Sequence, residues 1–188
     1  MDVVRHGILA SAREPFDPME KAFYALAPDD AVHRGLVLRW EYGLRPDLLA
    51  VINVWEAAER AELLAAAKGA PEAIAELCRL TGEERDQLVR AVDESAREGM
   101  RVLGVASAVL PLTTQRPETP RFVQFQFLGL VALTDPLRLT VPAAVQDCRT
   151  AGIRIVMITG DYPKTGARSP RRLASIPPRS SRVQNSIA

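Results

Sequence analysis

The sequence predicts an α+β fold, a sheet with helices, followed by a short α/β piece. Through residues 1–133, apolar segments of strand length alternate with segments of helical periodicity. Residues 141–158 then resemble one helix-to-strand step of a parallel sheet, with a continuous apolar strand at its end. Residues 167–188 carry five arginines, five serines, three prolines and no acidic residue, a composition that predicts disorder.

The composition indicates a soluble globular protein. The chain has 188 residues, of which 47% are hydrophobic and 25% charged, enough for one good core or two small ones. A net charge of +1 argues against a nucleic-acid partner. No apolar run reaches the ~20 residues of a membrane span. Cys78 and Cys148 have no metal-ligand spacing, and His6 and His33 are isolated, so we expect no metal site built on them.

The first half is predicted to contain a helix and two strands. A helix over residues 17–27 has Asp17 as its cap, Pro18 in its first turn and Glu20 closing a capping box. Strands are predicted at residues 37–42 and 51–55. Residues 56–67 are ambiguous, because their Ala, Glu and Leu favour a helix by propensity.

The second half starts with two predicted helices. The first begins at Pro71 and runs to about Leu80, and the second spans residues 83–98. Thr81 and Glu84 form a capping box for the second helix, and Gly99 ends it. The remaining segments are expected as a strand at 101–110, a loop at 113–120, a strand from 122 to 133, a helix at 141–151 and a strand at 153–158.

Three short motifs carry groups suited to phosphate chemistry. In Lys68-Gly69-Ala70-Pro71-Glu72, a point charge and a glycine lie before a helix N-terminus, although a solvated lysine would look the same. Asp135-Pro136-Leu137-Arg138 alone is compatible with a plain turn. Thr159-Gly160-Asp161 follows an apolar run and offers a hydroxyl and a backbone amide to phosphoryl oxygens, or forms a strand-end turn.

In this order, the three motifs resemble those of P-type cation-transporting ATPases, members of the haloacid-dehalogenase-like superfamily, and specifically pumps related to calcium ATPases. The resemblance covers residues 7–166. It implies a nucleotide-binding domain at 1–133, built as an antiparallel sheet with helices, and part of a phosphorylation domain at 134–166. That second piece would be an incomplete Rossmann-type α/β unit. The resemblance also favours a hairpin strand at 63–67 over a helix.

The resemblance assigns nucleotide-binding roles to residues in each motif. Lys68 and Gly69 would lie in the ATP pocket, with Arg101 on the phosphates and Leu103 on the pocket wall. Glu20 would lie near the adenine and Tyr42 would stack on it, although a helix cap and a core tyrosine explain these two equally well. The hinge and phosphate-site residues would be Asp135, Arg138, Thr159, Gly160 and Asp161.

Departures from the family pattern limit the expected activity. The sequence contains neither the phosphorylated motif Asp-Lys-Thr-Gly-Thr nor the magnesium motif Gly-Asp-Gly-x-Asn-Asp. Leu44 also stands where the family often has arginine. We therefore expect binding of ATP with Mg²⁺, without autophosphorylation or transport by this chain alone, so its status as an enzyme stays open.

The expected location is the cytoplasmic side of a pump, and a partner would be the remaining pump polypeptide. One alternative is a frameshift or pseudogene product, or an adaptor that binds through the basic tail. Another is a soluble dehalogenase-like phosphohydrolase. That reading is disfavoured because Asp29-Asp30 follows no strand that could present a nucleophile.

Overall fold

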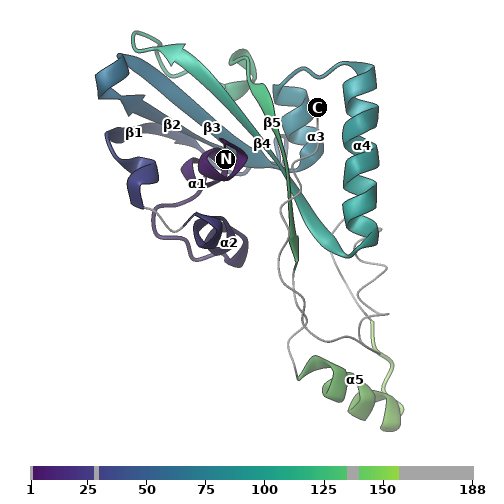
Figure 1. The fold of residues 1–188 in the computed structure, drawn as a ribbon. Helices are drawn as coiled ribbons and strands as arrows, with labels where there is room; N and C mark the ends of the chain where they lie inside the picture. The colour runs from purple at the N-terminus through teal and green to yellow at the C-terminus, as the bar shows by residue number, and fades with distance from the viewer. Residues whose placement is uncertain (1, 28–29, 135–139, 157–188) are drawn as a thin grey trace. The chain divides into compact units, whose positions relative to one another are not determined.

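A computed structural model describes residues 2–27, 30–134 and 140–156 of the chain (Figure 1). The helices are α1 (Asp2–Leu9), α2 (Pro18–Leu26), α3 (Pro71–Leu77), α4 (Gly82–Arg97) and α5 (Val141–Thr150). The strands are β1 (Leu36–Tyr42), β2 (Ala50–Ala57), β3 (Glu62–Gly69), β4 (Met100–Pro111) and β5 (Gln126–Thr134). Short 3-10 turns lie at Asp30–His33, Ala58–Arg60 and Pro120–Phe122.

The five strands form one sheet in the order β1-β2-β3-β4-β5. The pairs β1–β2, β2–β3 and β3–β4 are antiparallel. In the register, Tyr42 lies opposite Ile52, and Ile52 lies opposite Ala67. An irregularity between Leu38 and Trp40 shifts the alternation within β1. The predicted antiparallel sheet with helices is therefore confirmed.

The two faces of the sheet carry different helices because side chains alternate along each strand. On one face, Ala65 and Ala67 of β3 belong to a buried cluster with Ile74 and Leu77 of α3. On the other face, Ala66 packs with Leu9 of α1. Helix α1 lies against β3, with α2 beside α1 (Figure 1). The small alanines of β3 let helices approach the sheet from both sides.

The chain divides into two compact units. The first contains Met1–Leu88 and Leu103–Val131, and with them the buried clusters on both faces of the sheet. The second contains Val89–Val102 and the described residues from Ala132 onward, including α5. Helix α5 has no buried residue.

Most of the predicted elements are present. The helices expected near 17–27, 83–98 and 141–151 are α2, α4 and α5. The ambiguous segment 63–67 is a strand, and that strand also includes Lys68 and Gly69. The helix predicted from Pro71 to Leu80 ends earlier, at Leu77, because Arg79 adopts a left-handed φ of 53°. Helix α1 was not predicted.

The strand predicted at 153–158 is wrong where the structure describes it. Residues 153–156 are irregular and exposed, and no strand of the described residues pairs with them. An apolar run becomes a strand only when a partner strand satisfies its backbone groups. Residues 157–158 and the tail 167–188 lie outside the described residues. Among the helices that the structure does describe, none combines the length and hydropathy needed to cross a bilayer.

Candidate functional site

Lys68 is a buried charged residue in the middle of the first compact unit. It lies on β3 between Val51 of β2 and Val105 of β4, and only 7% of its surface is exposed. Because Ala67 faces α3, the alternation along β3 turns Lys68 toward the opposite face, where α1 and α2 lie. A buried lysine requires partners for its charge.

Those partners come from the segment after α1 and from α2. The Lys68 ammonium Nζ donates to Ser11 Oγ at 2.6 Å and to Glu20 Oε1 at 2.6 Å. It also lies 5.7 Å from the centroid of the Phe23 ring, within cation-π range. Ser11 Oγ in turn donates to the Gly7 carbonyl at 2.8 Å. We call Ser11, Glu20, Phe23 and Lys68 the Lys68 cluster.

Opposing effects act on the charge of Lys68. Burial lowers the pKa of Lys68, and this is the largest effect. The hydrogen bond and charge of Glu20, with a smaller contribution from Asp17, partly restore that pKa. The Glu20 side chain keeps 19% of its surface exposed, against 8% for the Lys68 side chain. The carboxylate is therefore the more accessible half of the ion pair.

Polar side chains of β2 hold the end of α1 in place. Asn53 Nδ2 donates to the carbonyls of Leu9 and Ser11 at 3.0 and 3.2 Å. Trp55 Nε1 also donates to the Leu9 carbonyl, at 2.9 Å. These bonds satisfy carbonyls at a helix C-terminus, where no intrahelical donors remain. They also fix the position of Ser11 beside Lys68.

Helices α1 and α2 meet at Gly7 and Phe23. A Cβ atom built on Gly7 would lie 2.1 Å from the Phe23 ring, so only glycine admits the ring at this distance. Phe23 is completely buried. The glycine in α1 therefore allows the aromatic ring to lie next to the ammonium of Lys68.

Glu20 takes part in the ion pair, and the predicted capping box is only half formed. Asp17 Oδ1 accepts from the amides of Met19 and Glu20 at 2.8 and 3.3 Å, which confirms Asp17 as the cap of α2. The described residues contain no return hydrogen bond from the Asp17 amide to Glu20. The Glu20 carboxylate instead reaches Lys68, because that contact compensates a buried charge.

The backbone next to β3 leaves no room for a side chain at Gly69. A Cβ at this position would lie 2.3 Å from the Leu49 carbonyl oxygen and 2.5 Å from the Ala50 Cα. The amide of Ala70 donates to the same Leu49 carbonyl at 2.8 Å. Close backbone packing thus accounts for the glycine in this structure, and a role toward a ligand stays a prediction.

Tyr42 is separated from the Lys68 cluster by the sheet. It lies opposite Ile52 in the register and belongs to the buried cluster on the α3 face. Its hydroxyl donates to the Pro117 carbonyl at 2.7 Å, and the Arg116 guanidinium lies 5.1 Å from its ring centroid. Burial raises the pKa of Tyr42, which Arg116 partly offsets. These contacts give Tyr42 a packing role, and its stacking on adenine stays a prediction.

The structure locates some of the other predicted site residues, and the rest lie outside the described part of the chain. Leu103 lies two positions from Val105, the partner of Lys68, so Leu103 and Lys68 point to the same face of the sheet. Arg101 is in β4 but in the second compact unit, where it has an interaction of its own. Its relation to Lys68 stays a prediction. The residues that fall outside the described part of the chain are Asp135, Arg138, Thr159, Gly160 and Asp161.

Sequence reasoning missed three members of the site. Ser11 and Phe23 contact the Lys68 ammonium, and Asn53 positions Ser11. Only Asn53 carried a signal in the sequence, as an amide inside the apolar strand Val51–Trp55. Within residues 2–27, 30–134 and 140–156, no group of three or more potential metal ligands comes together.

No family model matches the chain, but segments of several known proteins are similar to it. The chain is 36% identical over 121 residues to the sodium/potassium exporting P-type ATPase cta3 of Schizosaccharomyces pombe, covering 60% of this chain and 12% of that protein. It is 35% identical over 133 residues to the sodium/potassium-transporting ATPase subunit alpha of Hydra vulgaris, covering 61% and 13%. It is 39% identical over 117 residues to the potassium-transporting ATPase alpha chain 2 of Rattus norvegicus, covering 52% and 11%.

These relatives are far longer than the chain, which spans about an eighth of their length. The chain is thus similar to one segment of P-type ATPases. The five-stranded antiparallel sheet with helices is consistent with the nucleotide-binding domain of such proteins.

Proposed function

We propose that this chain binds ATP as the nucleotide-binding part of a P-type cation pump. The observation that carries the proposal is the Lys68–Glu20 ion pair, in which the lysine of the Lys-Gly-Ala-Pro-Glu motif meets the acidic residue assigned to the adenine. The similarity to P-type ATPase alpha chains supports the same conclusion. Residues 1–133 would form the nucleotide domain, and residues 134–166 part of the phosphorylation domain.

The chemistry of the pair suits an adenine nucleotide. The Glu20 carboxylate is the accessible partner and can accept a hydrogen bond from the 6-amino group of adenine. Lys68 supplies a fixed positive charge next to the Glu20 carboxylate. Leu103 provides an apolar wall on the same face of the sheet. Arg101 would add a second charge for the phosphates, and Mg²⁺ would arrive with the ATP. No aspartate nucleophile motif is present, so the proposed activity is binding.

Further parts of the proposal concern the pump as a whole. The chain would act on the cytoplasmic side of a membrane, together with the remaining pump polypeptide. The motif pattern favours a pump related to calcium ATPases. The named relatives carry sodium and potassium instead, so the transported ion would have to be tested on a complete pump.

A calorimetric titration with Mg-ATP tests the proposal. We expect a dissociation constant of about 0.1–1 mM for the wild type, and binding at least about tenfold weaker for Lys68→Met. Arg60→Gln removes a surface arginine that has no ion pair among the described residues, and serves as the charge-matched control. Far-UV circular dichroism on each variant shows whether it is folded.

A second variant keeps the test informative if Lys68→Met fails to fold. Glu20→Gln retains an acceptor oxygen but removes the charge, and it should lower the preference for ATP over GTP, whose purine presents an oxygen at the corresponding position. Absence of ATP binding by the folded wild type would refute the proposal. Equal binding by the wild type and a folded Lys68→Met would place the nucleotide elsewhere.

A further inference from the structure

A second cluster of cationic and aromatic side chains lies away from Lys68 in the same compact unit. Arg13, Tyr24, His33 and Arg34 line an open cavity of about 460 Å³. They come from three separate segments: the connection between α1 and α2, α2 itself, and the turn before β1. A volume of this size falls in the range that accommodates small organic ligands. We call these four residues the Arg13–Arg34 hollow.

Two residues that line the hollow, Tyr24 and His33, are aromatic, and the His33 ring contacts Trp55. The His33 ring stacks on Tyr24, with a centroid distance of 6.3 Å and an interplanar angle of 19°. It also meets the Trp55 ring at 5.0 Å and 58°. Trp55 is a buried residue of β2 and donates a hydrogen bond to the Leu9 carbonyl, so this group of aromatic rings is attached to the sheet. A flat ring of a ligand could extend such a stack.

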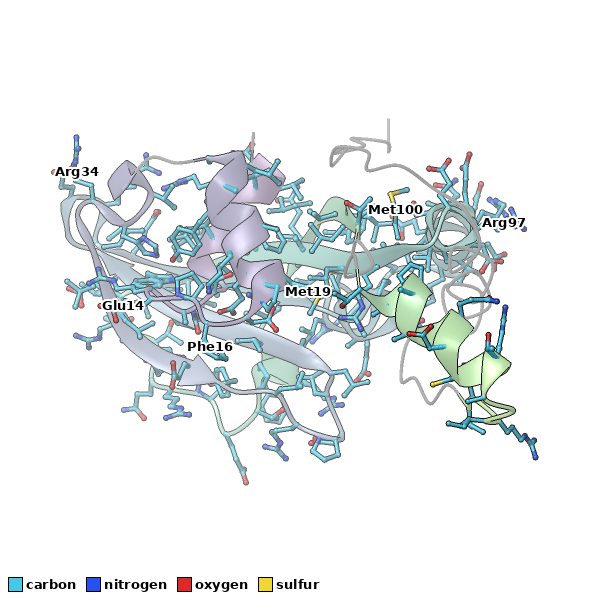
Figure 2. All side chains as sticks on the ribbon, turned by 90° about the horizontal axis from the view of Figure 1, so that it is seen from below. Glu14, Phe16, Met19, Arg34, Arg97 and Met100 are labelled. Atoms are coloured by element: carbon cyan, nitrogen blue, oxygen red, sulfur yellow. The ribbon has the colours of Figure 1, made fainter. Side chains whose placement is uncertain are left out.

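The hollow also carries two positive charges. The Arg13 guanidinium lies over the Trp55 ring, 5.6 Å from its centroid and within cation-π range. The Arg34 side chain is exposed and points outward from the ribbon (Figure 2). Among the described residues, neither arginine has a carboxylate partner. Guanidinium groups bind phosphate through paired hydrogen bonds, and two of them at one cavity favour a dianion.

We propose that the Arg13–Arg34 hollow binds a small phosphate monoester that carries a flat ring. The phosphate would lie between the two guanidinium groups, and the ring would stack against Tyr24 and His33. This site is separate from the Lys68 cluster, because Trp55 lies four residues along β2 from Val51, the partner of Lys68. Four residues of strand correspond to about 13 Å.

Phenyl phosphate is a suitable probe, followed by the indole N–H resonances in NMR spectra of the full chain. The sequence has 2 tryptophans, so Trp40→Phe assigns the Trp55 signal. We expect phenyl phosphate to shift the Trp55 signal saturably, and inorganic phosphate or phenol to bind at least about tenfold more weakly because each lacks one half of the recognition. Ionic strength is held constant throughout.

Variants separate specific from general charge effects. Arg34→Gln should weaken phenyl phosphate at least about tenfold while leaving the Trp55 contacts intact. Arg13→Gln should weaken it to the same degree, and it also removes the contact of Arg13 with the Trp55 ring. Arg60→Gln should bind like the wild type. No saturable shift in the folded wild type would overturn the proposal, as would equal weakening by Arg60→Gln. Lys68→Met should still bind phenyl phosphate, so failure of the ATP proposal leaves this one standing.

Discussion

Lys68 has a charge at a strand position whose cross-strand neighbours are valines. Its ammonium is stabilised by Ser11, Glu20 and the Phe23 ring, which come from different segments of the chain. Lys68 can bind a ligand only if its contacts with Ser11, Glu20 and Phe23 hold the ammonium group in position. The stability of the Lys68 cluster and any binding by it are therefore coupled.

Lys68→Met should lower the free energy of unfolding by about 1–3 kcal/mol, because Glu20 is left without its partner in a half-buried position. Adding Glu20→Leu should restore part of that loss, since the unpaired carboxylate is then gone. Urea unfolding of the two single variants and the double variant measures the coupling. If the stability changes of the two single variants add up to the change of the double variant, the interaction between Lys68 and Glu20 contributes nothing to stability.

His6 gives the unfolding free energy a dependence on acidic pH. The residue is buried in α1, and this burial lowers its pKa below the ordinary 6.5, although its bond to the Asp2 carbonyl acts in the opposite direction. As pH falls below 6.5, the unfolded chain binds a proton that the folded chain resists, so stability is lost down to the folded pKa.

We therefore expect the wild type to lose more stability between pH 7.5 and about pH 5.5 than His6→Gln does. Urea unfolding at both pH values measures this. His33 is present in both proteins and cancels in the comparison. Equal losses would mean that His6 titrates alike in both states.

At the scale of elements, helix α1 depends on a tertiary contact more than on its own sequence. Gly7 is a poor helix former, and it lies inside a helix of only 8 residues. The helix forms because Gly7 admits Phe23 and because Asn53 and Trp55 bind the Leu9 carbonyl. This explains why the sequence pattern did not predict it.

Two glycine substitutions in helices should have opposite effects. Gly7→Ala places a Cβ 2.1 Å from the Phe23 ring and should destabilise the chain by about 1–3 kcal/mol. Gly82→Ala, at the first residue of α4, meets nothing within 4 Å and should stabilise it by about 0.5–1 kcal/mol through helix propensity. Thermal unfolding of both variants measures the difference. A stable Gly7→Ala protein would mean that α1 and α2 can move apart.

The sequence predicted elements whose signals are local. The capping box of α4 is an example, with Glu84 Oε2 accepting from the Thr81 amide at 2.8 Å and Thr81 Oγ1 accepting from the Glu84 amide at 3.4 Å. Features that depend on strand pairing were not predictable. The strand predicted at 153–158 does not form over residues 153–156, because no described strand pairs with them. The face of the sheet on which Tyr42 lies follows from the strand register and from its irregularity after Leu38.

The candidate site, like the fold, was predictable only where local sequence motifs identify its residues. The resemblance identified Lys68 and Glu20, which the structure joins at 2.6 Å. It could not identify Ser11, because the serine reaches Lys68 only through the fold of α1. Local motifs therefore name the charged groups of the site, while packing decides which uncharged groups surround them.

At the scale of the molecule, the buried residues in the described part of the chain lie before residue 135. All five strands and the buried clusters on both faces of the sheet precede that position, whereas α5 buries no residue. Since burial of apolar surface is the main source of stability, the described residues 140–156 should add little to the unfolding free energy.

A chain shortened to residues 1–134 should therefore keep its unfolding free energy within about 1 kcal/mol of the full chain. Its circular dichroism should lose only the helical signal of α5. In a Trp40→Phe background, its Trp55 fluorescence should be unchanged, because the contacts of Trp55 with Leu9 and His33 precede the cut. Urea unfolding followed by both signals tests this, and two coincident transitions are expected. A large loss of stability would show that the later segment covers apolar surface of the sheet, and residues 1–133 would then not be an independent nucleotide domain.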